Sequence, residues 1–244
     1  MTANTTTILA RQSAATTSYP EWSSLYRLGG LAALLVVVCL PIQIAVFILN
    51  PPPDTVVGWF RLFQSSRLIG LLDLDLLLMV DQVLTVLIFL ALYTALRGTS
   101  QSILLIGTAL GLFSTVLFIA GNPAFAMSSL SDAYRAAATE PQKTIVLAAG
   151  QATMSQWQGS AFQVSYLIGS IAAIVISVVM LRSRLFSKAA ATMGILSNAL
   201  ALGLYVPRVG VYISVFSVVF LLAWYLLTGI RLLRLARITQ TELA

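Results

Sequence analysis

Six apolar runs, each about the length of a membrane-spanning helix, constrain this chain more than any other feature. An α-helix needs about 20 apolar residues to cross about 30 Å of hydrocarbon. The runs cover residues 28–49, 74–96, 102–121, 160–181, 189–206 and 209–230. Hydrophobic residues make up 59% of the 244 residues and charged residues only 9%, whereas a soluble domain carries roughly 25% charged residues. The sequence therefore predicts an all-α fold, a polytopic membrane helical bundle with six transmembrane helices.

A single membrane domain, residues 21–237, accounts for most of the chain. Residues 1–20 are rich in Thr, Ser and Ala and have too little apolar content to fold alone, so a disordered cytoplasmic tail is expected there. Residues 238–244 form a second short cytoplasmic tail. Pro207 and Arg208 separate the last two spans, which predicts a tight antiparallel hairpin because proline ends a helix.

The basic residues predict the orientation of these spans. The chain has 14 Lys and Arg residues, and the short segments "RSRLFSK" (182–188) and "RLLRLAR" (231–237) both fall on the side of the N-terminus. The positive-inside rule then places both termini in the cytoplasm. We expect "RLLRLAR" to extend the last helix as a lipid-facing anchor. Because the bases flank apolar runs, the +6 net charge indicates membrane lipids as partners and no nucleic acid.

Two longer connections are predicted on the outer side. In "NPPPDTVVGWFRLFQSSRLIG", residues 50–70, three prolines end the first span, and Trp59 and its aromatic neighbours suggest an interfacial helix at the headgroup level. Residues 122–159 are too polar to span and show helical spacing on both sides of Pro141. Short extracytoplasmic helices are therefore expected, either as a cap over the bundle or as surface helices without a role.

Acidic residues inside the second apolar run are the best indication of function. The stretch "GLLDLDLLLMVDQVL", residues 70–84, contains Asp73, Asp75 and Asp81. On one continuous helix Asp73 and Asp81 lie about 80° apart and share a face, whereas Asp75 does not. Only Asp81 is clearly submerged, where an unpaired carboxylate costs about 2 kcal/mol or more. Arg208 and Arg67 are the predicted counter-ions, in either a structural or a ligand-binding ion pair.

Other polar residues in the predicted spans share the outer half of the bundle with Asp81. They are Gln43, Gln82, Gln163 and Tyr166, with Asn198 near mid-depth. Such side chains face a bundle interior or water in preference to lipid. Two interpretations stay open: an outward-facing polar cavity, or hydrogen bonds that hold the helices together.

Several kinds of chemistry lack the residues they need. The chain has no histidine and one cysteine, Cys39, so histidine triads and the usual zinc and haem sites are excluded. It has no P-loop or dinucleotide-binding motif. We expect no enzymatic activity, no metal and no cofactor.

Small residues provide the close contacts between helices. The pattern "GTALG" runs from Gly107 to Gly111, and Ser165, Gly169 and Ala173 form a stripe at four-residue spacing. Such patterns bring helices together either within one chain or between protomers of a homo-oligomer.

Two segments, "SRLIGLLDLDLLLMVDQVLTVLIFLALYTALR" and "FSKAAATMGILSNALALGLYV", carry a family resemblance. The chain resembles the bacterial multi-pass family named domain of unknown function 4386 over roughly residues 25–232, with Arg67, Asp73 and Asp81 at the positions of the family's motif. Gln82, the additional Asp75 and the long connection after the third span depart from that pattern. The resemblance implies a six-span protein of the bacterial cytoplasmic (inner) membrane and implies no known activity.

Two functions are consistent with these observations. The first is a non-enzymatic membrane component whose polar groups serve binding or structure. The alternative is a small-solute or proton-linked transporter whose outward-facing cavity is centred on Asp81.

Overall fold

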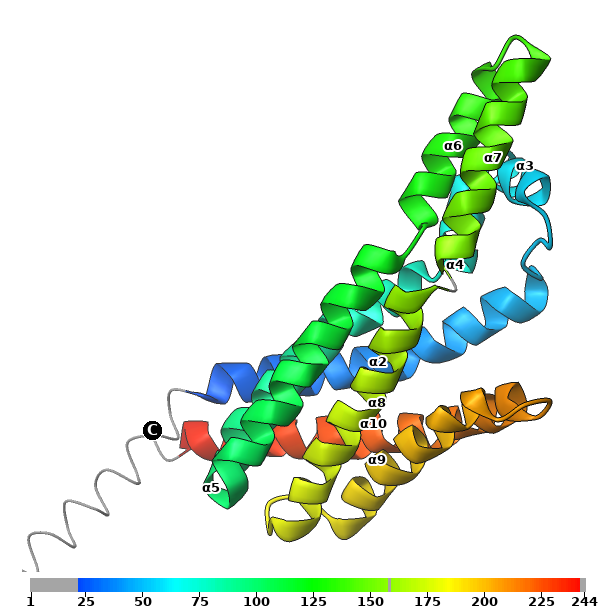
Figure 1. The fold of residues 1–244 in the computed structure, drawn as a ribbon. Helices are drawn as coiled ribbons and strands as arrows, with labels where there is room; N and C mark the ends of the chain where they lie inside the picture. Colours follow the sequence, from blue (N-terminus) through cyan, green and yellow to red (C-terminus); the bar gives the residue numbers. More distant parts are fainter. Residues whose placement is uncertain (1–21, 158, 242–244) are drawn as a thin grey trace, which may run out of the picture.

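The structure, a computed structural model, describes residues 22–157 and 159–241. All regular secondary structure among these residues is helical (Figure 1). The elements are α2 (Ser23–Leu49), α3 (Val56–Ser65), α4 (Arg67–Asp73), α5 (Leu76–Gly121), α6 (Ala124–Ala136), α7 (Glu140–Trp157), α8 (Ser160–Arg182), α9 (Lys188–Ala201), the 3₁₀ helix η2 (Leu202–Tyr205) and α10 (Gly210–Thr241). The tail expected at residues 1–20 lies outside the described residues.

Four helical segments are long and apolar enough to cross a membrane, which supports a membrane protein. They are Ser23–Leu49, Leu76–Ala136, Glu140–Arg182 and Gly210–Ile238. The expected span 189–206 is instead α9, of 14 residues, continued by η2. The predicted spans 74–96 and 102–121 both belong to α5.

Helix α5 is folded back on itself at Ser100, whose backbone angles of φ −161° and ψ 88° are not helical. Contacts between the two arms establish the reversal. Thr115 Oγ1 donates to Gln82 Oε1 at 3.3 Å, and Asn122 Nδ2 donates to the Leu74 carbonyl at 2.9 Å. The predicted second and third spans are thus two antiparallel arms.

The long helices form a ring of neighbours. Helix α5 packs on α2 and α8, α8 packs on α9, α9 on α10, and α10 returns to α2. Their shared core contains the fully buried Val36, Ile88, Leu92, Ile176 and Leu232. Leu232 lies in the basic segment "RLLRLAR", which extends the last helix as predicted and packs one side into the core.

The predicted small-residue stripes make contacts within this one chain. A Cβ at Gly111 would meet the Phe89 ring, one at Gly107 would lie 3.1 Å from Ile176, and one at Gly169 would lie 2.6 Å from Ser114 Oγ. These close approaches join the two arms of α5 to each other and to α8. Packing inside the chain therefore accounts for these glycines.

A second, smaller core joins the connecting helices. Helices α6 and α7 run side by side and project beyond the ring, with α3 against them (Figure 1). Trp59, Phe60 and Phe63 of α3 are 2%, 0% and 5% exposed, and they pack with Met127 of α6. The helical connections were predicted, and the aromatic side chains of α3 are buried against protein; their position at the headgroup level stays a prediction.

Candidate functional site

A break in the backbone places the three aspartates of residues 73–81 in different surroundings. Helix α4 ends at Asp73, and Asp75 has the left-handed φ of 66° before α5 begins at Leu76. Asp75 Oδ2 accepts a hydrogen bond from Trp157 Nε1 at 3.1 Å, and the preceding carbonyl of Leu74 accepts from Asn122. The prediction that Asp73 and Asp81 share the face of one helix was therefore wrong.

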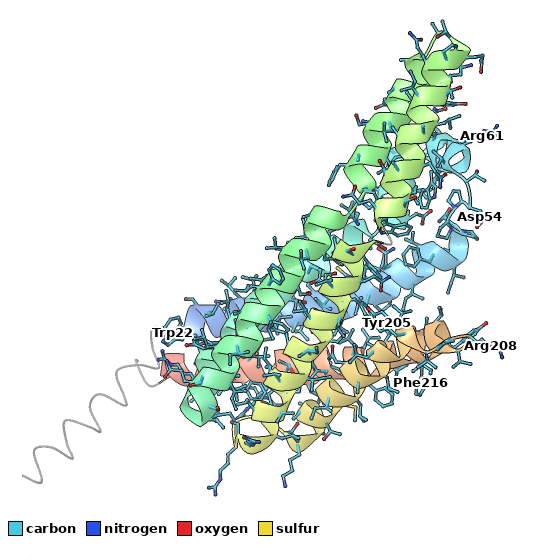
Figure 2. All side chains as sticks on the ribbon, viewed as in Figure 1. Trp22, Asp54, Arg61, Tyr205, Arg208 and Phe216 are labelled. Carbon is cyan, nitrogen blue, oxygen red and sulfur yellow. The ribbon has the colours of Figure 1, made fainter. Side chains whose placement is uncertain are left out.

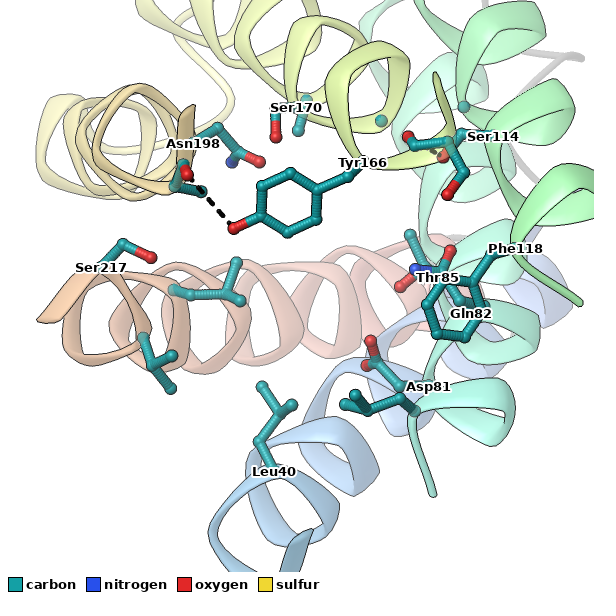
Figure 3. A pocket seen from close by; sticks show the side chains of 18 of the residues that line it. Leu40, Asp81, Gln82, Thr85, Ser114, Phe118, Tyr166, Ser170, Asn198 and Ser217 are labelled. Atoms are coloured by element: carbon teal, nitrogen blue, oxygen red, sulfur yellow. Dashed lines mark hydrogen bonds between the residues drawn. The ribbon is translucent and has the colours of Figure 1, made fainter. Parts of the chain in front are cut away.

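Asp81 lies in the second turn of α5 and lines a cavity inside the ring of helices (Figure 3). The cavity has a volume of about 260 Å³ and is lined by α2, both arms of α5, α8, α9 and α10. That volume corresponds to about nine water molecules at roughly 30 Å³ each. It lies just below the range of about 300–1,000 Å³ typical of small-molecule sites, so the space suits a small solute.

Polar side chains from four helical segments face this cavity. Tyr166 of α8 crosses it, and its hydroxyl lies 2.7 Å from Ser214 Oγ of α10 and donates to the Ala201 carbonyl at 3.2 Å (Figure 3). Thr85 Oγ1 lies 3.0 Å from the Tyr225 hydroxyl. Ser114 donates to the Ser165 carbonyl at 2.8 Å. These bonds fix the hydroxyl groups and leave little freedom in the walls.

Asp81 differs from these neighbours because its carboxylate is not satisfied. The residue is 8% exposed, and its Oδ1 is buried without a hydrogen-bond partner in the described part of the chain. Trp224 also lines the cavity, and its Nε1 is likewise buried without a hydrogen-bond partner among the described residues. Buried polar groups normally have partners. Trp224 Nε1 lies beside Gly194 and Ser177, which do not line the cavity. The group that the cavity offers to an occupant is therefore the acceptor carboxylate of Asp81.

Neither predicted counter-ion reaches Asp81. Arg67 pairs with Asp132 of α6, which also accepts from Arg135 at 3.1 Å. Arg208 has a positive φ of 69° and lies exposed at the tip of the turn between η2 and α10, at the far end of that hairpin (Figure 2). The prediction of an ion pair on Asp81 was wrong, because Arg67 is held by Asp132 and Arg208 lies exposed at the tip of the hairpin.

Three other predicted site residues also lie outside the cavity wall. Gln43 is buried and donates from Nε2 to the Leu72 carbonyl at 2.9 Å, which ties α2 to α4. Asp73 is fully buried, and neither carboxylate oxygen has a hydrogen-bond partner among the described residues. Gln163 is exposed on α8. Of the predicted site residues, the cavity brings together Asp81, Gln82, Tyr166 and Asn198.

Sequence reasoning missed most of the hydroxyl-bearing wall. Thr85, Ser170, Ser214, Ser217 and Tyr225 all line the cavity. One signal was available, because Thr85 lies four residues after Asp81 and Ser217 three after Ser214, spacings that share a helix face. Serine and threonine are also common at ordinary helix contacts in membranes, so this spacing alone does not identify a site.

Known proteins add no further indication of function. Comparison with protein-family models, curated proteins and solved structures gives no match to this chain. The resemblance to domain of unknown function 4386 therefore stays a prediction. Within residues 22–157 and 159–241, no group of three or more Cys, Asp or Glu side chains is placed to hold a metal ion.

Proposed function

We propose that this protein crosses the membrane six times and binds a small positively charged solute in the cavity at Asp81, without catalysing a reaction. The crossings are α2, the two arms of α5, α8, α9 with η2, and α10. An even number returns both termini to the same side, and the basic segments of residues 182–188 and 231–237 favour the cytoplasm of a bacterial cell for that side. Asp73, in α4, lies outside these crossings.

The single observation that carries the proposed binding is the buried carboxylate of Asp81 without a basic partner. An isolated charge in an apolar interior is costly, and buried charges are paired or neutralised. A protonated amine or quaternary ammonium group supplies the missing charge. The aromatic rings of Tyr166, Trp224 and Tyr225 at the cavity wall add cation–π attraction, which is worth about 2 kcal/mol or more when desolvated.

Ligand-dependent thermal stability tests this proposal. The purified protein in detergent is heated with small primary and quaternary ammonium compounds and with neutral molecules of the same shape. A cation present at 100 times its Kd stabilises the folded state by about 2.7 kcal/mol. We expect stabilisation by cations only, lost in Asp81→Asn and kept in Asp54→Asn, which removes an exposed carboxylate from the protein surface. Equal stabilisation of the two variants would contradict the proposal.

A second candidate function, proton-linked transport, is favoured by the same lack of a base. An acid without a basic partner can be neutralised either by a cation or by a proton, so the two compete for one group. Exchange of a cationic solute for protons follows if the cavity opens alternately to each side. Reconstituted liposomes test this directly: a transporter moves solute in response to a pH gradient, and Asp81→Asn abolishes that response. Binding without flux would leave the protein a non-transporting membrane component.

A further inference from the structure

A second cavity lies at the end of the bundle away from α6 and α7. It has a volume of about 370 Å³ and is formed by the start of α2, the fold in α5 and the loop between α8 and α9. Trp22 marks this end of the molecule, whereas Arg208 marks the opposite end (Figure 2). The cavity shares no lining residue with the one at Asp81, so the two can be altered separately.

Two arginines give this second cavity its charge. Arg97 and Arg184 both line it, and Arg97 lies over the Trp22 ring at 5.4 Å from the centroid. The salt bridges found among the described residues involve neither arginine. None of the described acidic residues, which run from Asp54 to Glu140, lines this cavity. The cavity is thus basic.

Hydroxyl groups complete a set of donors suited to an anion. Thr99 and Ser183 line the same cavity. Ser183 Oγ accepts from the Leu185 amide at 3.0 Å, which leaves its own proton free to be donated. Arg231 of α10 donates to the Leu185 carbonyl and so holds this loop in place. Arginine recognises phosphate through paired N–H donors, and basic pockets between transmembrane helices bind anionic lipid headgroups.

We infer that Arg97 and Arg184, with Thr99 and Ser183, form a binding site for a phosphate group, carried either by an anionic phospholipid headgroup or by a free phosphate ion. The volume of about 370 Å³ holds a phosphate with a small polar substituent. Position favours the lipid, because α2 begins, α5 folds back and α8 ends around the cavity, and headgroups lie at the ends of membrane-spanning segments.

Lipid titration followed by native mass spectrometry tests this inference. The purified protein is titrated with phosphatidylglycerol and, separately, with zwitterionic phosphatidylcholine, and inorganic phosphate is titrated by calorimetry. We compare a variant carrying Arg97→Gln and Arg184→Gln with one carrying Arg61→Gln and Arg208→Gln, which loses the same charge at the other end. A further variant, with Arg97→Lys and Arg184→Lys, keeps the positive charge. It shows whether weaker binding in the glutamine variant comes from the lost charge or from misfolding.

The inference predicts that the glutamine pair at residues 97 and 184 weakens phosphatidylglycerol binding by about tenfold or more, a change of about 1.4 kcal/mol. The lysine pair weakens it less, and the pair at residues 61 and 208 leaves it unchanged. If inorganic phosphate binds saturably and the glutamine pair at residues 97 and 184 weakens that binding too, the natural ligand is the free ion. If only phosphatidylglycerol binds, the natural ligand is the lipid headgroup. Equal affinity in both glutamine variants, or no binding of either ligand, would overturn the inference.

Discussion

The fold of α5 at Ser100 makes a sharp prediction at Gly111. A Cβ added there would lie 2.2 Å from Cε2 and 2.3 Å from Cδ2 of Phe89, whose ring is 4% exposed. Twenty-two residues separate these positions in the sequence, and in a straight helix they would lie about 33 Å apart. Gly111→Ala therefore tests directly whether the two arms lie against each other.

The cost of this substitution follows from opposing effects. Overpacking a buried contact costs about 1–3 kcal/mol, whereas alanine favours a helix over glycine by about 0.5–1 kcal/mol. Gly98 provides the matched control, because a Cβ there meets nothing within 4 Å. Gly98→Ala should therefore gain the stabilisation from the higher helix propensity of alanine without any steric clash. The difference between the two variants is therefore expected to be about 1–3 kcal/mol, with Gly111→Ala the less stable.

Thermal unfolding in detergent measures this difference. A change of 1 kcal/mol shifts the Tm of a chain of this size by about 2–4 °C. Phe89→Leu removes the ring atoms that the new methyl group meets, so Gly111→Ala should cost less in that background. An identical cost with and without the Phe89 ring, or equal Tm values for the two alanine variants, would refute the folded-back arrangement of α5.

Three further predictions concern the end of the bundle near α4. Burial raises the pKa of Asp73 from its usual 3.8 to about 6. Because the folded state then holds this proton more tightly than the unfolded state, the contribution of Asp73 to stability should fall as the pH rises from about 4 to about 6 and stay constant above that interval; the Tm of Asp73→Asn should fall less over that interval. Trp157→Phe removes the hydrogen bond to Asp75 and should lower the free energy of unfolding by about 1.5–3 kcal/mol, and an unchanged denaturant midpoint would contradict it. Arg67→Ala breaks only an exposed ion pair with Asp132, so it should cost less than about 1 kcal/mol and leave cation binding unchanged in the thermal-shift assay.

Length and hydropathy predict the long helices because lipid requires about 20 apolar residues per crossing. Residues 28–49 and 160–181 match α2 and α8 closely. The helices on either side of Pro141 also follow from local spacing, with α7 beginning at Glu140. These features depend on neighbouring residues in the chain, so one sequence is enough to show them.

The break between α4 and α5, in contrast, cannot be predicted from neighbouring residues in the chain. Leucines continue through residues 71–78, and nothing local indicates that Asp75 takes a left-handed conformation. The groups that contact this turn, Asn122 and Trp157, are 48 and 82 residues away from their partners. The same holds for Arg67, whose partner Asp132 lies on α6. Depth and helical angle identified Asp81 as submerged, but long-range contacts decide which side chains accompany it.

Cysteine reactivity inside the cavity tests the central claim, a cation-selective site at Asp81, most directly. In a Cys39→Ala background, Ser170→Cys places a thiol on the cavity wall, and Ser177→Cys places one at a fully buried position of the same helix that does not line the cavity. The rates of reaction with small thiosulfonate reagents of opposite charge are compared in lipid nanodiscs. The account predicts that Ser170→Cys reacts faster with the positive reagent, that Asp81→Asn removes this preference, and that Ser177→Cys does not react. Equal rates with both reagents, or a preference that persists in Asp81→Asn, would contradict it.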